Sequence, residues 1–258
     1  MRLWSILLLA ALAWSEDGDK ADKPRRKTAA ELEFADPGVK IQDSSSARRE
    51  VARFLKEFKA AKKDEFKSAE LIKTMLGKWD HPLVLKEARK LVHHKSHFVA
   101  VQAVIVCARQ TSEKAKTGGF LLKSLKRESR NHVRCALLVA MGVLGYDREA
   151  AKKEAKGYFR RDTRETHKAA TRYMGLVKDK AAFRLLAEKL DAPRAGNVNS
   201  PTNPPASWWR ERWEEWNSNK KWTRWAISQL VEGESFDTKA EAKDWAKSAE
   251  ARKHGIKW

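Results

Sequence analysis

The chain has 258 residues, enough for one or two globular domains, and 42% of them are hydrophobic, so it can bury a core. It contains 54 lysine and arginine residues against 34 acidic residues, and the resulting formal net charge of +20 favours anionic partners or surfaces. Only 12 glycines and 7 prolines occur, and few segments alternate with the two-residue period of a strand, so the composition argues against a β-rich fold and favours an all-α one.

The first 15 residues have the features of a signal peptide. Arg2 supplies a positive start, the run from Leu3 to Ala13 is apolar, and a small-x-small cleavage site ends at Ser15. The apolar run has 11 residues, fewer than the about 20 that a membrane-spanning helix needs. We therefore expect cleavage after Ser15, a mature chain without a transmembrane segment, and a secreted, periplasmic or cell-envelope location. An uncleaved anchor is the alternative.

Residues 16–46 are rich in charged and turn-forming residues and show little periodicity, so they are expected to form a disordered tether. Helices are expected from about residue 47, where Ser44 to Ser46 offer N-caps. Apolar residues at helical spacing then mark two helices: Val51, Phe54, Leu55 and Phe58 in the first, and Phe66, Leu71, Ile72, Met75 and Leu76 in the second. We interpret this pair as an atypical first repeat that caps the stack.

One pattern recurs through the middle of the chain. In its central copy, apolar residues form one stripe of a helix: Val133, Ala136, Leu137, Ala140, Met141 and Leu144. The small residues Ala108, Gly142 and Gly175 are 34 and 33 residues apart, within the range of helical-hairpin repeats. A second helix follows each turn, at Asp80–Leu91, Asp147–Tyr158 and Asp179–Leu190. The predicted unit is therefore helix, turn, helix, and residues 47–192 form the stack.

The run V-R-x-x-A-x-x-x-A-M-G-x-L-G from Val133, followed by D-x-x-A, resembles the HEAT repeat, in particular the short bacterial HEAT-like class named after phycobilisome lyases. The likeness covers roughly residues 63 to 190. It implies a right-handed α-solenoid with an Arg–Asp ladder near the turns, to which Arg134, Asp147 and Asp179 correspond. Ala100 and His167 stand where the ladder would have Arg. No lyase activity is implied, because this module recurs in many unrelated proteins.

A turn-rich linker at residues 193–206 precedes an unusual C-terminal region at residues 207–258. Eight of the 11 tryptophans lie there: Trp208, Trp209, Trp213, Trp216, Trp222, Trp225, Trp245 and Trp258. The pattern predicts one helix from Ser207, a second from Trp222 to Val231, and a third that a capping box at Thr238 opens. Their indoles are expected to form the core of a compact helical cap.

An exposed carbohydrate platform is the alternative role for these indoles, because an indole face stacks on a sugar ring. Trp208 is the candidate for an exposed ring, since it is out of phase with its neighbours. The sequence from Ala226 to Thr238 also resembles the tail that follows HEAT stacks in secreted bacterial proteins, which implies a module without known chemistry.

Other candidate sites are weaker. His93 and His97 have the spacing of a helical metal pair but straddle an expected turn, so no metal is expected. Cys107 and Cys135 occupy positions six residues apart in the repeat register, too far for a disulfide, and are expected to be free core thiols. Basic residues form a strip that suits an acidic polysaccharide, an anionic lipid surface or an acidic protein, if it is not simply a solvated edge: Lys123, Lys126, Arg127, Arg130, Arg160, Arg161 and Arg164.

The sequence shows no G-x-S-x-G motif, no Gly-rich phosphate loop and no distinctive pair of carboxylates. We therefore expect no catalytic residues and no cofactor, and predict an exported, non-enzymatic scaffold that binds a protein partner through a preformed solenoid surface. Two alternatives stay open: a polyanion- or glycan-binding protein that uses the basic strip and an exposed Trp, and an accessory subunit of an envelope enzyme. Export argues against DNA or RNA as the ligand.

Overall fold

The computed structural model describes residues 38–160, 164–194, 202–232 and 234–258. The predicted signal peptide and residues 16–37 of the predicted tether lie outside the described residues. Apart from two short strands, the described secondary structure is helical, which confirms the expected all-α class. Across the described part of the chain, every helix is too short or too polar to cross a membrane.

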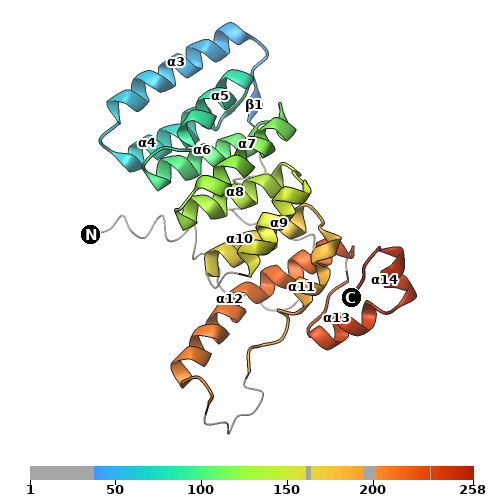
Figure 1. The fold of residues 1–258 in the computed structure, drawn as a ribbon. Helices are drawn as coiled ribbons and strands as arrows, with labels where there is room; N and C mark the ends of the chain where they lie inside the picture. The colour runs from blue at the N-terminus through green and yellow to red at the C-terminus, as the bar shows by residue number, and fades with distance from the viewer. Residues whose placement is uncertain (1–37, 161–163, 195–201, 233) are drawn as a thin grey trace, which may run out of the picture.

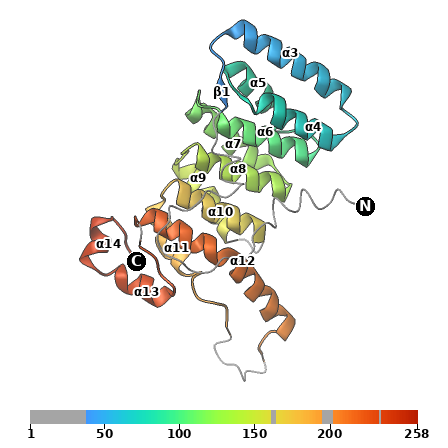
Figure 2. The same ribbon diagram turned by 180° about the vertical axis from the view of Figure 1, so that it is seen from behind.

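Five helices lie side by side in chain order and form the central row of the molecule (Figures 1 and 2). They are α4 (Glu65–Leu71), α6 (His97–Arg109), α8 (Asn131–Val143), α10 (Arg164–Leu176) and α12 (Ala206–Leu230). The helices between them each pack on the next member of the row: α5 (Pro82–Leu91), α7 (Lys114–Arg127), α9 (Glu149–Phe159) and α11 (Phe183–Ala187). Each helix therefore contacts mainly its neighbours in sequence and the equivalent helix of the adjacent hairpin.

The three small residues of the repeat occupy one equivalent position. Ala108, Gly142 and Gly175 are the penultimate residues of α6, α8 and α10, which have 13 residues each. Adjacent helices approach closely there: a Cβ atom on Gly142 would lie 3.2 Å from the Cα of Tyr173, and one on Gly175 would lie 3.0 Å from the Cα of Ala226. A side chain at either position would push the two neighbouring helices apart.

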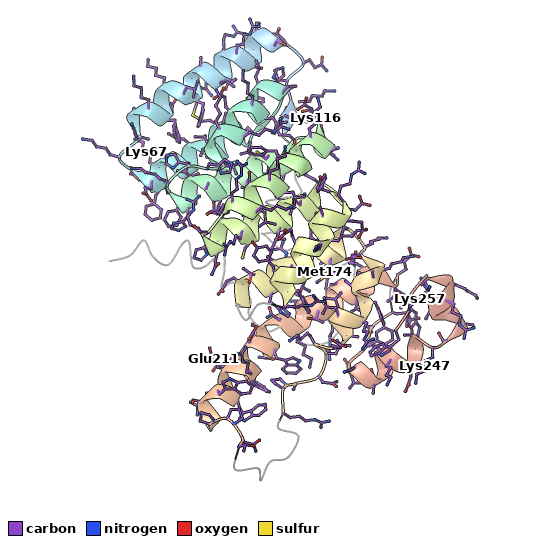
Figure 3. The ribbon with its side chains drawn as sticks, viewed as in Figure 1. Lys67, Lys116, Met174, Glu211, Lys247 and Lys257 are labelled. Atoms are coloured by element: carbon purple, nitrogen blue, oxygen red, sulfur yellow. The ribbon has the colours of Figure 1, made fainter. Side chains whose placement is uncertain are left out.

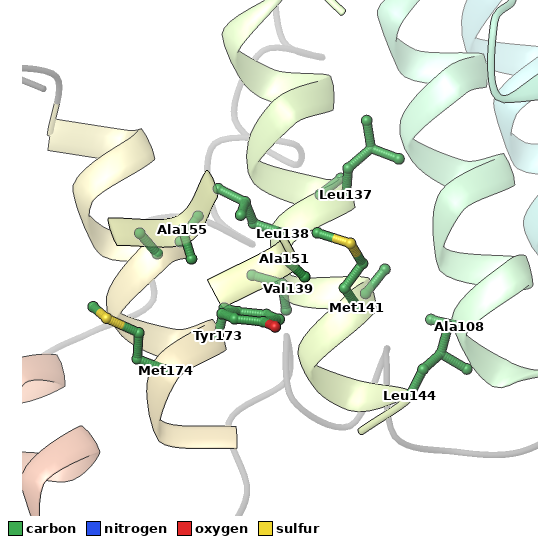
Figure 4. Packing of buried hydrophobic residues seen from close by; sticks show 14 of the residues in the cluster. Ala108, Leu137, Leu138, Val139, Met141, Leu144, Ala151, Ala155, Tyr173 and Met174 are labelled. Atoms are coloured by element: carbon green, nitrogen blue, oxygen red, sulfur yellow. The ribbon is translucent and has the colours of Figure 1, made fainter. Parts of the chain in front are cut away.

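The core runs without interruption along this row (Figure 4). Leu137 and Met141 of α8 are fully buried, as are Tyr173 and Met174 of α10. Small residues such as Ala151 bring α9 against them. Each large apolar side chain buried in this way contributes about 1.5–3 kcal/mol, so the row is stabilised at every step by its own neighbours.

The chain becomes ordered earlier than the sequence suggested. Asp43 accepts hydrogen bonds from the amides of Ser45 and Ser46, so helix α3 (Ser44–Ala60) begins three residues before the predicted start. Strand β1 (Val39–Lys40) pairs in parallel with β2 (Trp79–Asp80). The last part of the predicted tether is therefore attached to the first hairpin, and a π-helix (Ile72–Leu76) extends α4.

The C-terminal region differs from the prediction of three short helices. Residues Ala206–Leu230 form one continuous helix, α12, and only α13 (Lys239–Trp245) and α14 (Ala249–Lys253) are short. The two helices predicted from Ser207 and from Trp222 are therefore joined. No proline or glycine lies within α12 to interrupt it, and its second half packs on α10. The helix predicted at 179–190 is shorter than expected, with a 3-10 turn (Lys180–Ala182) before α11. Half of the predicted capping box forms: the Thr238 hydroxyl accepts from Glu241 N at 3.2 Å, whereas the Glu241 carboxylate accepts from the amide of Asp237 at 2.8 Å instead of that of Thr238.

Substitution of the glycines tests the close approach. Gly142→Ala and Gly175→Ala should each lower stability by about 1–3 kcal/mol, because the added methyl overpacks against α10 or α12. Gly157→Ala is the matched control, since a Cβ there meets no atom within 4 Å and the site is helical. It should raise stability by about 0.5–1 kcal/mol. Denaturant unfolding measures all three, and equal effects at the three glycines would contradict the packing described.

Candidate functional site

Helix α12 is longer than the row requires. It has 25 residues against the 13 of α10, and its second half accounts for the packing: Ala226 lies against Gly175, and the Trp222 ring lies under Arg172, at 4.8 Å. Its first half, residues 206–218, extends beyond α10 (Figures 1 and 2). We call these residues the Trp arm, because they carry Trp208, Trp209, Trp213 and Trp216.

The indoles of the Trp arm are not the shared core that the sequence suggested. Trp213 is 49% exposed and Trp208 is 38% exposed. Trp208 packs edge-on against Trp209, with ring centres 4.7 Å apart, and the guanidinium of Arg212 lies 5.2 Å from its centre. Figure 3 shows this half of α12, with Glu211 labelled, extending beyond the rest of the row. The prediction of an exposed Trp208 agrees with the structure, and the placement of Trp213 in a core face was wrong.

The other C-terminal indoles lie closer to the expected cap. Trp222 is fully buried, and Trp245 packs on Phe183 of α11 and on Phe236, with ring centres 5.7 Å and 5.4 Å apart. Trp216 is intermediate: its Nε1 donates to the carbonyl oxygen of Leu190 at 3.1 Å. The change from buried to exposed indoles therefore occurs within α12, where the helix leaves α10.

Arg130, which the sequence assigned to the basic strip, has a structural role instead. Its guanidinium donates to both oxygens of Glu128 and to the carbonyl oxygens of His94 and Lys95, at 2.8–2.9 Å. The pKa of Glu128 is lowered to about 2, mainly because the Arg130 side chain donates hydrogen bonds to its carboxylate. Arg130 therefore joins the start of α8 to the turn before α6, and its charge is already neutralised.

The rest of the strip is divided. Lys126 of α7 lies 4.0 Å from Glu154 of α9, which places these helices next to each other. Lys123, Arg127 and Arg160 are exposed, and among the described contacts none of them has an ion pair. Arg161 lies outside the described residues, and Arg164 begins α10 with a side chain that is likewise not described. Three cations from two neighbouring elements remain as a candidate anion-binding surface.

The Arg–Asp ladder implied by the HEAT likeness does not form between the residues assigned to it. Arg134 donates from Nε to the carbonyl oxygen of Glu128 and covers the ring of Tyr158 at 5.9 Å. Asp179 is buried and pairs with Lys156 at 3.0 Å, whereas Asp147 is exposed. The Arg134 side chain folds back onto its own hairpin, which removes it from both aspartates.

Turn-to-turn hydrogen bonds replace the ladder elsewhere. Asp80 accepts from the amide of Thr111 at 3.1 Å, and Gln110 donates to the carbonyl oxygen of Trp79 at 2.8 Å. Tyr173 donates from its hydroxyl to the carbonyl oxygen of Tyr146 at 2.7 Å. Each of these bonds crosses from one hairpin to its neighbour, so polar side chains near the turns hold adjacent repeats in register.

The histidines and cysteines take structural positions. His93 lies 3.1 Å from the Ser124 hydroxyl, and His97 stacks on His132 with ring centres 5.5 Å apart, so the predicted i, i+4 pair does not converge. Within the described residues no group of three or more His, Cys, Asp or Glu side chains is arranged to hold a metal ion. Cys107 and Cys135 are free, and burial raises the pKa of each thiol to about 12, which leaves both unreactive at neutral pH.

The imidazoles at the α5–α6 turn make stability depend on pH. Burial lowers the pKa of His94 and of His97 below 6.5, and the nearby Lys95, Arg130 and His132 act in the same direction against Glu65. The unfolded chain therefore binds protons first as the pH falls, and stability is lost as the pH drops through about 6.5.

The melting temperature should fall between pH 7.5 and 5.5, and it should fall less in a His94→Gln/His97→Gln variant. His254→Gln, far along the chain, is the control, and equal slopes in all three proteins would contradict the assignment.

Comparison with known proteins adds no relative. No family model, no curated protein and no solved structure matches this chain. The resemblance to HEAT repeats therefore rests on the spacing and identity of residues such as Gly142 and Gly175. Function has to be inferred from the geometry of the Trp arm and of the surfaces around it.

Proposed function

We propose that this protein is a non-enzymatic binding scaffold: an exported, right-handed α-solenoid of HEAT-like hairpins that presents the Trp arm to a protein partner. The repeat of small residues at 34 and 33 residues and the row from α4 to α12 support the solenoid. The observation that carries the binding role is the exposure of Trp208 and Trp213 on a helix half that extends beyond α10.

The composition of the Trp arm suits a protein partner. Tryptophan and arginine are the residues that most often dominate binding energy at protein interfaces, and exposed indoles lose unfavourable contact with water when they enter a pocket. Arg212 lies over the Trp208 ring and holds it in place, which reduces the side-chain entropy lost on binding. A helix half that extends beyond its neighbour and exposes Trp208 and Trp213 fits the helix-in-groove mode of recognition.

The charges of the Trp arm favour the same class of partner. Arg210 and Arg212 alternate with Glu211, Glu214 and Glu215. A surface with both signs offers little to a polyanion, but it can match a mixed polar rim around an apolar groove. The proposal includes no catalysis.

Crosslinked pull-down of the exported protein tests this proposal. Trp208→Ala/Trp213→Ala should reduce recovery of one stoichiometric partner at least tenfold, because truncated hot-spot residues cost about 2 kcal/mol or more each. Phe66→Ala is the matched control, since Phe66 is 55% exposed at the other end of the row. A partner captured equally by both variants would exclude the Trp arm as its docking site. A partner that is an envelope enzyme would identify the protein as an accessory subunit.

A specific observation favours polyanion or glycan binding as a second candidate function. Lys123 and Arg127 on α7 and Arg160 after α9 are exposed and have no ion pair among the described contacts, in a chain of net charge +20. Cations without partners at a solvent-exposed edge attract acidic polymers, with an affinity that salt weakens.

Binding to polygalacturonate tests the second candidate. Lys123→Gln/Arg127→Gln should weaken binding several-fold and reduce its salt dependence, because two charges that contact the polymer are lost. Lys56→Gln/Lys67→Gln removes the same charge from exposed positions on α3 and α4 and should leave binding nearly unchanged. Equal losses in the two variants would show attraction by net charge alone and would contradict a defined strip.

A further inference from the structure

A small cavity lies where the Trp arm leaves the row. Its volume is about 220 Å³, and its walls come from the end of α9, from α10, from the residues after α11 and from the middle of α12. Phe159, His167, Lys189 and Trp216 are among the lining residues. Arg212 and Trp216 of the Trp arm line the cavity, but the exposed rings of Trp208 and Trp213 do not, so the cavity adjoins the proposed docking surface without including its exposed rings.

Two aromatic walls are fixed by hydrogen bonds within the protein. The Trp216 indole donates to the carbonyl oxygen of Leu190 at 3.1 Å, and Nδ1 of His167 donates to the carbonyl oxygen of Phe159 at 2.9 Å. Because a carbonyl oxygen only accepts, the latter bond also sets which nitrogen of His167 carries the proton. The cavity therefore keeps its shape without a ligand.

Asn219 supplies a polar group without a partner. Its side chain lines the cavity, the residue is only 4% exposed, and its Oδ1 has no hydrogen bond in the part of the chain that the structure describes. A buried polar atom left unsatisfied costs about 1–3 kcal/mol, so this position is unfavourable unless something in the cavity donates to it. A hydroxyl group satisfies an amide in either orientation, since it both donates and accepts.

The charges around the cavity favour an anion. Two of its three carboxylates are paired, Glu188 with Arg184 and Glu215 with Arg212, whereas Asp191 accepts only from the backbone amide of Lys239 and keeps its negative charge. Arg160 and Lys189 also line the cavity, and neither has an ion pair among the described contacts. Two positive charges and one negative charge are therefore left to a ligand, a net positive balance, next to an amide oxygen that lacks a hydrogen-bond donor.

We propose that this cavity binds one small hydroxylated carboxylate, of the class of a single uronic acid residue. Its volume is below the about 300–1,000 Å³ of sites for drug-sized ligands, which limits the occupant to about one ring. The carboxylate lies between Arg160 and Lys189, a hydroxyl donates to Asn219, and the ring packs against Trp216. This inference goes beyond the scaffold function, which needs no small ligand.

Titration of the full chain with glucuronate tests the inference, with glucose as the neutral probe. Glucuronate should raise the melting temperature and shift the NMR signal of the Trp216 indole, and glucose should do neither. Asn219→Leu should raise the melting temperature of the free protein, because it removes an unsatisfied polar atom, and should abolish the glucuronate effect. Lys189→Gln should weaken glucuronate binding at least fivefold, and Lys180→Gln, exposed nearby on the 3-10 turn, should not change it.

Three results would overturn the assignment: equal responses to glucose and glucuronate, a glucuronate effect that persists in Asn219→Leu, or no response to either sugar in the unmodified chain. The last result would mean that water alone occupies the cavity. Trp208→Ala/Trp213→Ala should keep glucuronate binding while losing the protein partner, so this test fails independently of the scaffold proposal.

Discussion

The close approach of neighbouring helices at one repeated position is the constraint on which the rest of this structure depends. Gly142 and Gly175 let α8 meet α10 and α10 meet α12 with almost no space between backbones. Packing at this density makes even one added methyl group costly. The spacing of α8, α10 and α12 is thereby set by contact between their backbones.

Because the helices of the row contact mainly their neighbours, the free energy of folding comes from contacts within and between adjacent hairpins. The polar bonds that join hairpins connect each turn to the adjacent one, as between Gln110 and Trp79 or between Arg130 and His94. In such an arrangement stability is approximately a sum over units and the interfaces between them. The termini of the row therefore matter most, because each has one neighbour only. Helix α3 covers one end, and α12 with the short helices α13 and α14 covers the other.

Both proposed binding sites lie where α12 extends beyond α10. The half of α12 that matches α10 buries Trp222 and Ala226, and the half that does not carries Trp208 and Trp213 into solvent. Exposed indoles and a small polar cavity next to them are costly features for a purely structural cap. Their presence at the same point of the helix is the reason to assign binding to this end of the molecule.

The sequence by itself determined the features that are written in local periodicity. Apolar spacing predicted the helices, and the small residues at 108, 142 and 175 each lie at the penultimate position of a helix of the row. Only the tertiary structure decided what each polar or aromatic side chain faces. The sequence placed Arg130 in a strip of surface cations, but Glu128 neutralises its charge. The sequence placed Arg134 in a ladder with aspartates, but its guanidinium lies over the Tyr158 ring. Trp213 has the spacing of a core residue, yet it is exposed, because it lies on the half of α12 that extends beyond α10. Periodicity depends on the backbone of one helix, whereas exposure depends on which other elements cover it, and that information lies outside any single segment.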